Sequence, residues 1–174
     1  MNEFAITAIG HDRPGIVGGF TKVLLDLGCN LADCSMSMLR DQFAMILLVE
    51  APDSVAIEQL NTALRQAAAA FGLLVETRPV IEEPVQGGAA AYVLSVYGQD
   101  RPGIVHAVAR TLGDSGVNIT DLRSHLAGLD LYAMILDIAV PPSVDLETLV
   151  RQLQYTTRDL GVSLTVRSAE AAEL

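Results

Sequence analysis

The sequence is poor in cysteine, contains no tryptophan and has no long apolar run. Its two cysteines, Cys29 and Cys34, have a spacing that fits neither a CxxC redox pair nor a zinc knuckle, so we expect two reduced thiols near the core. The run "AMILLV" at 44–49 falls far short of the ~20 apolar residues that span a bilayer, which argues against a membrane protein. The stretch "MNEFAITAIG" lacks the basic region and apolar core of an export signal, so we expect a cytoplasmic location.

Basic side chains are also scarce, with 11 Lys and Arg against 21 Asp and Glu and a net charge of −10. This charge repels a phosphate backbone, whereas nucleic-acid-binding domains normally present a basic face. The basic residues are scattered over the chain, and the predicted helices form no helix-turn-helix pair. We therefore expect no direct contact with nucleic acid.

Motifs of catalysis are missing as well. The sequence has no GxSxG, HExxH, Walker loop or EF-hand spacing, and its Cys and His residues pair at no motif spacing. Of the histidines, His106 is expected on the outer side of a helix and His125 on a solvated or inter-copy sheet face. We therefore predict no catalytic site, no metal site and no cofactor.

The sequence does contain an internal repeat. The stretch "GHDRPGIVGG" at 10–19 returns as "GQDRPGIVHA" at 98–107, and "FAMIL" at 43–47 returns as "YAMIL" at 132–136. Between the copies, "EEPVQGGAA" is rich in charged residues, Pro and Gly, as linkers are. The predicted organisation is a domain at 1–81, a linker at 82–90, a second domain at 91–168 and a tail at 169–174.

Within each copy the spacing of the hydrophobic residues switches between strand-like alternation and helical spacing in a regular order. In the first copy, residues 3–9 alternate like a strand, and apolar residues from Ile16 to Leu27 repeat at helical spacing, with Pro14 in the first turn. The remaining elements are predicted as strands at 30–39 and 43–51, a helix at 54–71 with Ser54 as N-cap, and a strand at 73–80. This order predicts an α+β, ferredoxin-like fold (βαββαβ) in both copies.

In such a fold the helices cover one face of the sheet and leave the other partly open. Open faces and edge strands tend to be covered, and two tethered copies meet at a high effective concentration. We therefore predict that the copies pair within the chain, with a homodimer as the alternative.

The repeated turn lies between the first strand and the first helix of each copy. Free backbone N–H groups from Gly15 onward, at the positive end of the helix, favour a carboxylate or phosphate. Asp12 offers an acceptor to an ammonium group, and the Asn30 amide both donates and accepts, so the set suits a free amino acid. The candidate ligand-binding residues are His11, Asp12, Arg13, Gly15, Ile16 and Asn30, with Asp100, Arg101, Gly103, Ile104 and Asn118 in the second copy.

A structural interpretation of the same residues remains open. An Asp before a Pro-started helix is a favoured N-cap, and Asn is common where a chain turns into a strand. Gly18 and Gly19 lie inside the first helix, where each costs roughly 1 kcal/mol relative to Ala, so close packing or ligand access should compensate. His11 becomes Gln99 in the second copy, so two ligand sites would differ.

The stretches "GHDRPGIVGGFTKVLLDLGCNLADCSMSML" and "GQDRPGIVHAVARTLGDSGVNITDLRSHL" resemble the ACT domain, a ferredoxin-like module that in its family senses amino acids and other small metabolites. The run "GCNLADCSMSMLRDQFAMILLV" is similar, more narrowly, to the glycine cleavage system transcriptional repressor family, whose members consist of two ACT domains. The resemblance implies a non-enzymatic regulatory protein that represses through a DNA-binding protein partner.

The resemblance also implies which residues bind the ligand. The ligand pattern of ACT domains falls on the aspartates Asp12 and Asp100, the glycines Gly15 and Gly103, and the asparagines Asn30 and Asn118. In many ACT pairs the turn of one copy faces the second strand of the other. The turn also resembles the regulatory domain of formyltetrahydrofolate deformylases, so a stand-alone regulatory pair of that kind is an alternative, as is an interaction module without a ligand.

Overall fold

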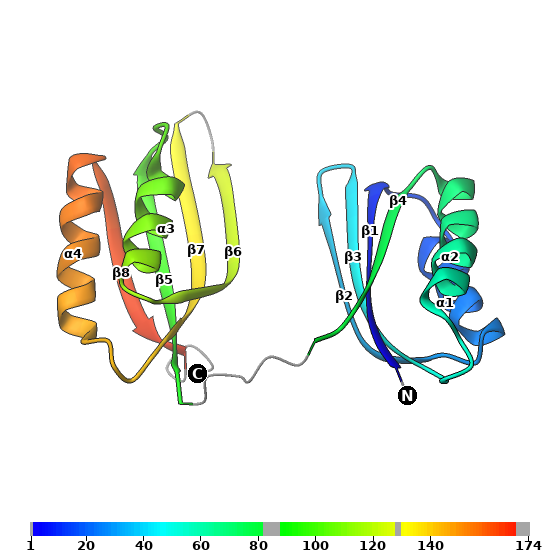
Figure 1. Ribbon diagram of the computed structural model, residues 1–174. Coiled ribbons are helices and arrows are strands. Elements are labelled where there is room, and N and C mark those ends of the chain that lie inside the picture. Colours follow the sequence, from blue (N-terminus) through cyan, green and yellow to red (C-terminus); the bar gives the residue numbers. More distant parts are fainter. Residues whose placement is uncertain (1, 82–87, 128–129, 170–174) are drawn as a thin grey trace. The chain divides into compact units, whose positions relative to one another are not determined.

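The computed structural model describes residues 2–81, 88–127 and 130–169 (Figure 1). The chain divides into two compact units, Met1–Glu83 (unit 1) and Pro84–Leu174 (unit 2). Each unit has its own sheet, its own pair of helices and its own core. Residues 82–87 of the predicted linker and 170–174 of the predicted tail lie outside the described residues.

Unit 1 has the element order that the hydrophobic periods predict. Its elements are β1 (Asn2–His11), α1 (Ile16–Asp26), β2 (Asn30–Leu39), β3 (Gln42–Ala51), α2 (Ile57–Phe71) and β4 (Leu74–Pro79). The strands form one antiparallel sheet in the order β2-β3-β1-β4, and both helices lie on one face of it (Figure 1). The β2–β3 hairpin turns at Arg40, which has a φ of 58°.

Unit 2 repeats this layout. Its elements are β5 (Ala90–Gln99), α3 (Ile104–Asp114), β6 (Asn118–Ala127), β7 (Leu131–Val140), α4 (Leu146–Asp159) and β8 (Val162–Ser168). The sheet order is β6-β7-β5-β8, again antiparallel. The ferredoxin-like α+β fold predicted for both copies is therefore confirmed.

Each core forms between one sheet face and two helices. Side chains alternate along a strand and recur every three to four residues in a helix, so each element presents one apolar face. In α1 the buried positions are Ile16, Phe20 and Leu24, and in α4 Leu149 and Leu153 are buried. Burying one such side chain stabilises the fold by roughly 1.5–3 kcal/mol, and the predicted inward stripes account for the cores.

The helix starts differ from the prediction. Helix α1 begins at Ile16, after an N-cap residue Gly15 in the left-handed conformation, so Pro14 precedes the helix and does not lie in its first turn. No side chain caps α1, and the interpretation of Asp12 as an N-cap is therefore wrong. Glycine tolerates the positive φ that turns the chain into the helix, and no side chain caps the first N–H groups of α1.

The second helices differ from each other at their starts. Helix α2 follows Ala56 and has no side-chain cap, so the predicted N-cap Ser54 is wrong. Helix α4 is capped by Asp145, whose carboxylate accepts the N–H of Thr148 at 2.9 Å. Hydrogen bonds from Thr148, with a smaller effect of the Arg151 charge, lower the pKa of Asp145.

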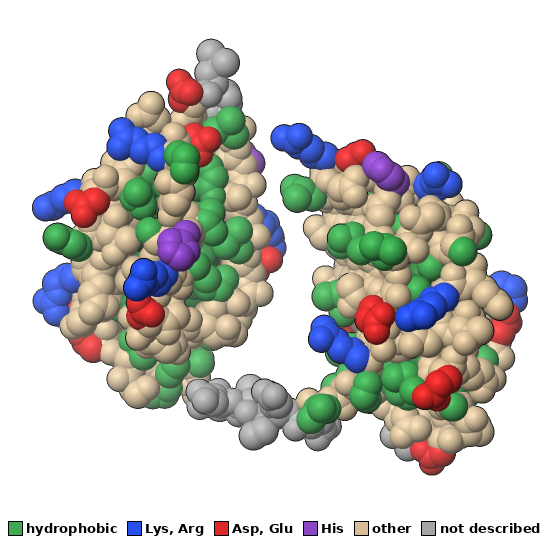
Figure 2. Space-filling view, turned by 45° about the horizontal axis from the view of Figure 1, so that its top comes forward, with side chains coloured by type: hydrophobic (Ala, Val, Ile, Leu, Met, Phe, Trp, Pro, Cys, Tyr) green, Lys and Arg blue, Asp and Glu red, His purple; other side chains and the backbone are tan. Residues whose placement is uncertain are grey.

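The helix-free face of each sheet carries exposed apolar side chains. Ile9, Ile46 and Leu74 lie on this face in unit 1, and Tyr97 and Ile135 lie on it in unit 2. Figure 2 shows hydrophobic side chains among the charged ones on the surface of both units. Pairing of the two units stays a prediction. In the described part of the chain, no helix has the length and hydropathy needed to cross a bilayer.

Candidate functional site

The repeated turn has the same backbone geometry in both units. The N-cap residue of α1 is Gly15, with a φ of 95°, and that of α3 is Gly103, with a φ of 99°. Side chains are strained at such φ values, which accounts for glycine at both positions. Asp12 and Asp100, which precede these glycines, are exposed.

The first turn of each helix offers unpaired backbone donors. The first intrahelical bond runs from the Gly19 N–H to the Gly15 carbonyl at 2.8 Å, and from Ala107 to Gly103 at 2.9 Å. The N–H groups before these donors have no intrahelical partner. A Cβ at Gly15 would contact only the Phe71 ring, at 3.8 Å, among the described residues, and one at Gly103 would meet none of them within 4 Å. Little of the described structure therefore crowds the chain at these two glycines.

Each turn is attached to the hairpin of its own unit. The Asp12 N–H donates to the Asp41 carbonyl at 3.2 Å, and the Asp100 N–H donates to the Asp130 carbonyl at 2.9 Å. Because this bond is present in both units, the backbone of the aspartate is held in the same way beside each helix end.

A histidine accompanies the turn in unit 1. His11 Nδ1 lies 3.2 Å from the Asp41 carboxylate and 3.4 Å from Gln42 Nε2. Hydrogen bonds from the Gln42 side chain and the Asp41 backbone, with a smaller effect of His11, lower the pKa of Asp41. In unit 2, Gln99 replaces His11 and accepts a hydrogen bond from Arg101 at 3.4 Å. The two turns therefore differ in the side chains that surround them.

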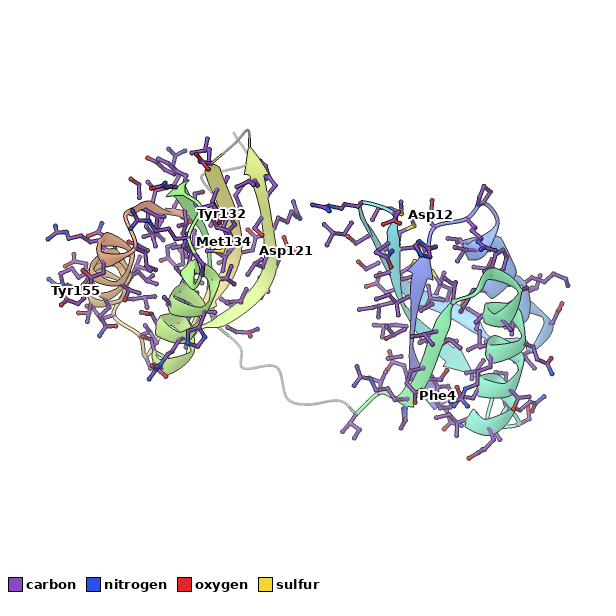
Figure 3. All side chains as sticks on the ribbon, turned by 90° about the horizontal axis from the view of Figure 1, so that it is seen from above. Phe4, Asp12, Asp121, Tyr132, Met134 and Tyr155 are labelled. Atoms are coloured by element: carbon purple, nitrogen blue, oxygen red, sulfur yellow. The ribbon has the colours of Figure 1, made fainter. Side chains whose placement is uncertain are left out.

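Asn30 lies at the far end of the sheet from Asp12. It opens β2 opposite Glu50, to which its amide donates at 3.4 Å, whereas Asp12 follows the end of β1 that pairs with Gln42. The strand from Gln42 to Glu50 spans roughly 27 Å at about 3.4 Å per residue. Figure 3 shows Asp12 at the end of β1 opposite to Phe4. Unit 2 repeats this arrangement, so neither unit brings its own aspartate and asparagine together.

The two glycines inside α1 have different surroundings. A Cβ at Gly19 would lie 2.9 Å from the Phe71 ring, so close packing accounts for this glycine. A Cβ at Gly18 would meet no described atom within 4 Å, and packing does not explain it. His106 is exposed on α3, and His125 is exposed on β6, where it pairs with Ala133 on the helix-free face. Both histidines lie where the sequence predicts them.

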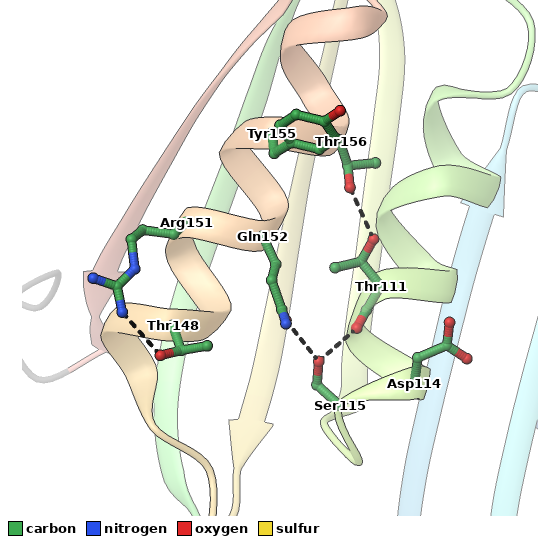
Figure 4. A pocket seen from close by; sticks show the side chains of 8 residues that line it. All are labelled: Thr111, Asp114, Ser115, Thr148, Arg151, Gln152, Tyr155 and Thr156. Carbon is green, nitrogen blue, oxygen red and sulfur yellow. Dashed lines mark hydrogen bonds between the residues drawn. The ribbon is translucent and has the colours of Figure 1, made fainter.

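A polar groove between α3 and α4 has no signal in the linear sequence. Its volume is about 530 Å³ (Figure 4), and it is lined by Thr111, Asp114, Ser115, Thr148, Arg151, Gln152, Tyr155 and Thr156. The hydroxyls of Thr111 and Thr156 lie 3.2 Å apart, and Ser115 donates to Gln152 at 3.4 Å. These polar groups bond to one another across the two helices. The groove is recognisable only once the helices lie side by side.

The described residues contain no group of three or more His, Cys, Asp or Glu side chains arranged to hold a metal ion. Partial burial raises the pKa of the Cys29 thiol. The repeated turn is therefore the arrangement that best combines open backbone donors with an exposed charge, and it is the candidate functional site.

Comparisons with known proteins identify both repeats. The ACT domain family matches residues 2–78 and, a second time, residues 92–155. A UPF0237 protein of Methanopyrus kandleri is 39% identical over 74 residues, which cover 42% of this chain and 82% of that protein.

Two further proteins match most of the chain. The glycine cleavage system transcriptional repressor of Escherichia coli is 29% identical over 124 residues, which cover 71% of this chain and 65% of the repressor, slightly less than two thirds of its length. A crystal structure of an unknown protein from Galdieria sulphuraria has a TM-score of 0.82 at 29% identity and covers 97% of this chain and 98% of its own. Together with the fold of both units, these matches show that the chain belongs to the ACT domain family and carries two ACT domains in tandem.

Proposed function

We propose that this protein binds a small amino acid at its repeated turns and regulates a protein partner, without catalytic activity of its own. The observation that carries the proposal is the open helix end at Gly15 and Gly103, where no side chain caps the helix. Unpaired N–H groups and the positive end of the helix dipole favour a carboxylate at such an end.

Each charged group of an amino acid has a partner at the turn. The carboxylate accepts hydrogen bonds from the N–H groups that follow Gly15, beginning with Ile16. The ammonium group pairs with the Asp12 carboxylate, which is exposed beside the helix end. Arg13 lies next to Asp12 and adds a second donor for the carboxylate. In unit 2, Asp100, Arg101, Gly103 and Ile104 take the corresponding roles.

The asparagines enter this proposal through pairing of the units. Because Asn30 lies at the far end of its own sheet, it serves a ligand held by the turn of unit 2, and Asn118 serves one held by the turn of unit 1. Cutting the chain between Gly87 and Gly88 tests the pairing. Paired units predict that the separated halves lose stability or associate with each other, whereas two monomeric halves as stable as the intact chain would contradict it.

The regulatory part of the proposal rests on a relative and on charge. The Escherichia coli relative is named a transcriptional repressor, and a net charge of −10 disfavours direct contact with DNA. In this proposal the protein acts in the cytoplasm on a DNA-binding partner, and the amino acid biases that contact through its different affinity for the free and bound forms. Pull-downs with and without the amino acid should recover a partner in different yield. Salt-sensitive binding of the purified protein to duplex DNA would contradict this part.

A thermal-shift screen of the twenty amino acids tests ligand binding. A ligand at 100 times its Kd stabilises the protein by about 2.7 kcal/mol, which raises Tm by roughly 5–11 °C in a chain of this size. Replacing Asp12 and Asp100 together with Ala should abolish the shift and leave the protein folded. The matched control replaces Asp26 and Asp114, which lie at the opposite ends of the same helices and pair with Lys22 and Arg110 there. A Tm that responds to no amino acid would favour an interaction module without a ligand.

A further inference from the structure

One side of helix α4 in unit 2 carries an exposed tyrosine between two arginines. Arg151, Tyr155 and Arg158 are spaced four and three residues apart, so their side chains leave the helix on the same side. The opposite side of α4 carries Leu149 and Leu153, which are buried in the core of unit 2. Tyr155 is 70% exposed. The two arginines and the tyrosine together form the α4 face.

The arginines of the α4 face lack the ion pairs that other basic residues make. Arg151 donates to the Thr148 hydroxyl at 3.0 Å. In the described part of the chain, neither Arg151 nor Arg158 forms an ion pair, although Glu147 lies one turn before Arg151. Four other basic side chains do pair with a carboxylate, and they are Lys22, Arg65, Arg110 and Arg123. Both guanidinium groups of the α4 face therefore keep donors for a group outside the chain.

The fold does not require these side chains. Helix α2 of unit 1 buries the same leucine stripe, and at the positions of the α4 face it has Thr62, Gln66 and Ala69. Arg158 lies in the last turn of α4, where a positive charge favours the helix dipole. This effect does not extend to Arg151 or Tyr155, which lie further from the helix end. The core and the helix dipole thus leave most of the α4 face unexplained.

Two hollows of the surface adjoin the α4 face. One is the polar groove between α3 and α4, with a volume of about 530 Å³ (Figure 4). The other has a volume of about 200 Å³ and is lined by Arg151, Gln154, Tyr155 and Arg158. Tyr155 and Arg151 line both hollows. Tyrosine and arginine are the residue types that contribute most at protein interfaces, and hollows beside them can receive partner side chains.

We propose that the α4 face is the docking surface for the regulated protein, and that the docking segment of that protein is acidic. The existence of a regulated protein rests on the proposed function, and the charge of the face selects the chemistry of the segment. Carboxylates of the segment accept paired hydrogen bonds from Arg151 and Arg158. The chain as a whole has a net charge of −10 and repels an acidic segment elsewhere, so the contact is specific for this face.

Photo-crosslinking from the centre of the face tests the proposal. The full chain with Tyr155→p-benzoylphenylalanine is irradiated in cytosolic extract, and mass spectrometry identifies the segment that becomes attached. We expect one attached protein, through a segment with more Asp and Glu than Lys and Arg. Gln66→p-benzoylphenylalanine is the matched control, because Gln66 has the corresponding position on α2. It should give at least about tenfold less attached product.

Charge variants separate docking from folding. Arg151→Glu with Arg158→Glu should lower the yield of attached product at least about tenfold. Arg151→Lys with Arg158→Lys keeps the charge and should retain much of the yield, although Lys lacks the planar fork of Arg. Lys22→Glu with Arg65→Glu changes the net charge of the chain equally, but in unit 1, and should leave the yield unchanged. All four residues are exposed, so each variant should remain folded, which its Tm verifies.

Several results would overturn the docking proposal. These are no attachment at Tyr155, attachment to a second copy of this chain or to a segment without excess acid, equal yield from Gln66, and full yield after both arginines become Glu. The pull-down distinguishes this failure from failure of the proposed function. Equal recovery of one partner by the unmodified protein and by the Arg151→Glu, Arg158→Glu variant would refute the surface and leave the regulatory function standing. Recovery of no partner by the unmodified protein would refute both.

Discussion

The two units share one fold but differ in the seam between their helices. In unit 1 the groove between α1 and α2 has a volume of about 390 Å³, and the residues that form its apolar floor include Val23, Leu27, Ala63 and Ala67. The corresponding positions of unit 2 are Thr111, Ser115, Gln152 and Thr156, which form the polar groove between α3 and α4. The seam thus changes from apolar to polar, whereas the buried stripes beneath it change only at Thr157 of α4, which corresponds to Ala68 of α2.

The repeated turn shows the opposite behaviour. Gly15 and Gly103 have φ values of 95° and 99°, and the aspartate N–H donates to the hairpin carbonyl in both units. The core stripes fix the fold, so a seam at the surface is free to differ. The turn retains its backbone geometry although neither the sheet nor the helix needs an exposed aspartate there. This contrast supports a function for the turn.

The largest expected difference between the units concerns the glycine before the last residue of the first strand, which is Gly10 in unit 1 and Gly98 in unit 2. A Cβ at Gly98 would lie 3.0 Å from two backbone atoms, the Gly161 carbonyl oxygen and the Val162 Cα. At Gly10 the nearest backbone atom, the Gly72 carbonyl oxygen, would be 3.3 Å away, and the closest contact is the end of the Leu73 side chain, at 2.6 Å. Side-chain ends can rotate away and backbone cannot. We expect Gly98→Ala to cost about 1–3 kcal/mol and Gly10→Ala to cost less. Urea denaturation of both variants measures this, and a larger loss for Gly10→Ala would contradict it.

The second comparison is a double-mutant cycle inside unit 1. Gly19 makes room for Phe71, whereas unit 2 has Ala107 and Leu160 at the corresponding positions. Gly19→Ala gains about 1 kcal/mol of helix propensity but forces the Phe71 ring to move. With Phe71→Leu in place, as in unit 2, the same change should stabilise the protein by about that full amount. Identical effects of Gly19→Ala in the two backgrounds would show that the ring does not restrict this position.

The third comparison exchanges helix caps. Ala56→Asp gives α2 the cap that Asp145 provides for α4 and should stabilise unit 1 by about 1 kcal/mol. Asp145→Ala should lower the Tm of unit 2 by a few degrees. Because the pKa of Asp145 is lowered in the folded protein, its contribution is present above the unfolded pKa of about 4 and is lost as pH falls through the folded value. The difference between Asp145→Ala and the unmodified protein should therefore shrink in acid, and a constant difference down to pH 2 would contradict the cap.

The smallest expected effect concerns the polar seam itself. Replacing Thr111 with Val and Thr156 with Ala gives unit 2 the pair that unit 1 has at Val23 and Ala67. Removing both partners of a hydrogen bond together is nearly neutral, so stability should change by less than about 1 kcal/mol. Hydrogen exchange of α3 and α4 amides measures this locally. A loss of several kcal/mol would show that the seam holds the helices of unit 2 together.

Most of the fold can be predicted from the spacing of apolar residues, because a stripe at helical spacing marks each helix and an alternation marks each strand. The helix starts do not follow from the sequence pattern. Asp12 and Pro14 form a favourable start for α1, but the chain enters that helix through Gly15, which has a positive φ. Ser54 is a favourable N-cap, but α2 begins after Ala56. The placement of Asn30 relative to Asp12 depends on α1 carrying the chain back along the sheet. The sequence pattern identifies both residues as candidates, but it does not predict the distance between them.

The identity of the proposed ligand is less accessible to sequence reasoning. Backbone N–H groups at Ile16 and Ile104 can donate to any carboxylate, so the proposed site selects a chemical class and no single amino acid. The polar groove depends on which faces of α3 and α4 meet, so the tertiary arrangement is needed before it can be recognised.

The central claim is that the open helix ends bind an amino acid. The most direct measurement is a ¹H–¹⁵N NMR titration of the intact protein with the amino acid that raises Tm most. The account predicts saturable shifts of the Ile16, Val17 and Gly18 amides, and of Ile104 and Val105 in unit 2, that disappear when Asp12 and Asp100 are replaced with Ala. Saturable shifts confined to the groove between α3 and α4, with the amides after Gly15 and Gly103 unmoved, would contradict it.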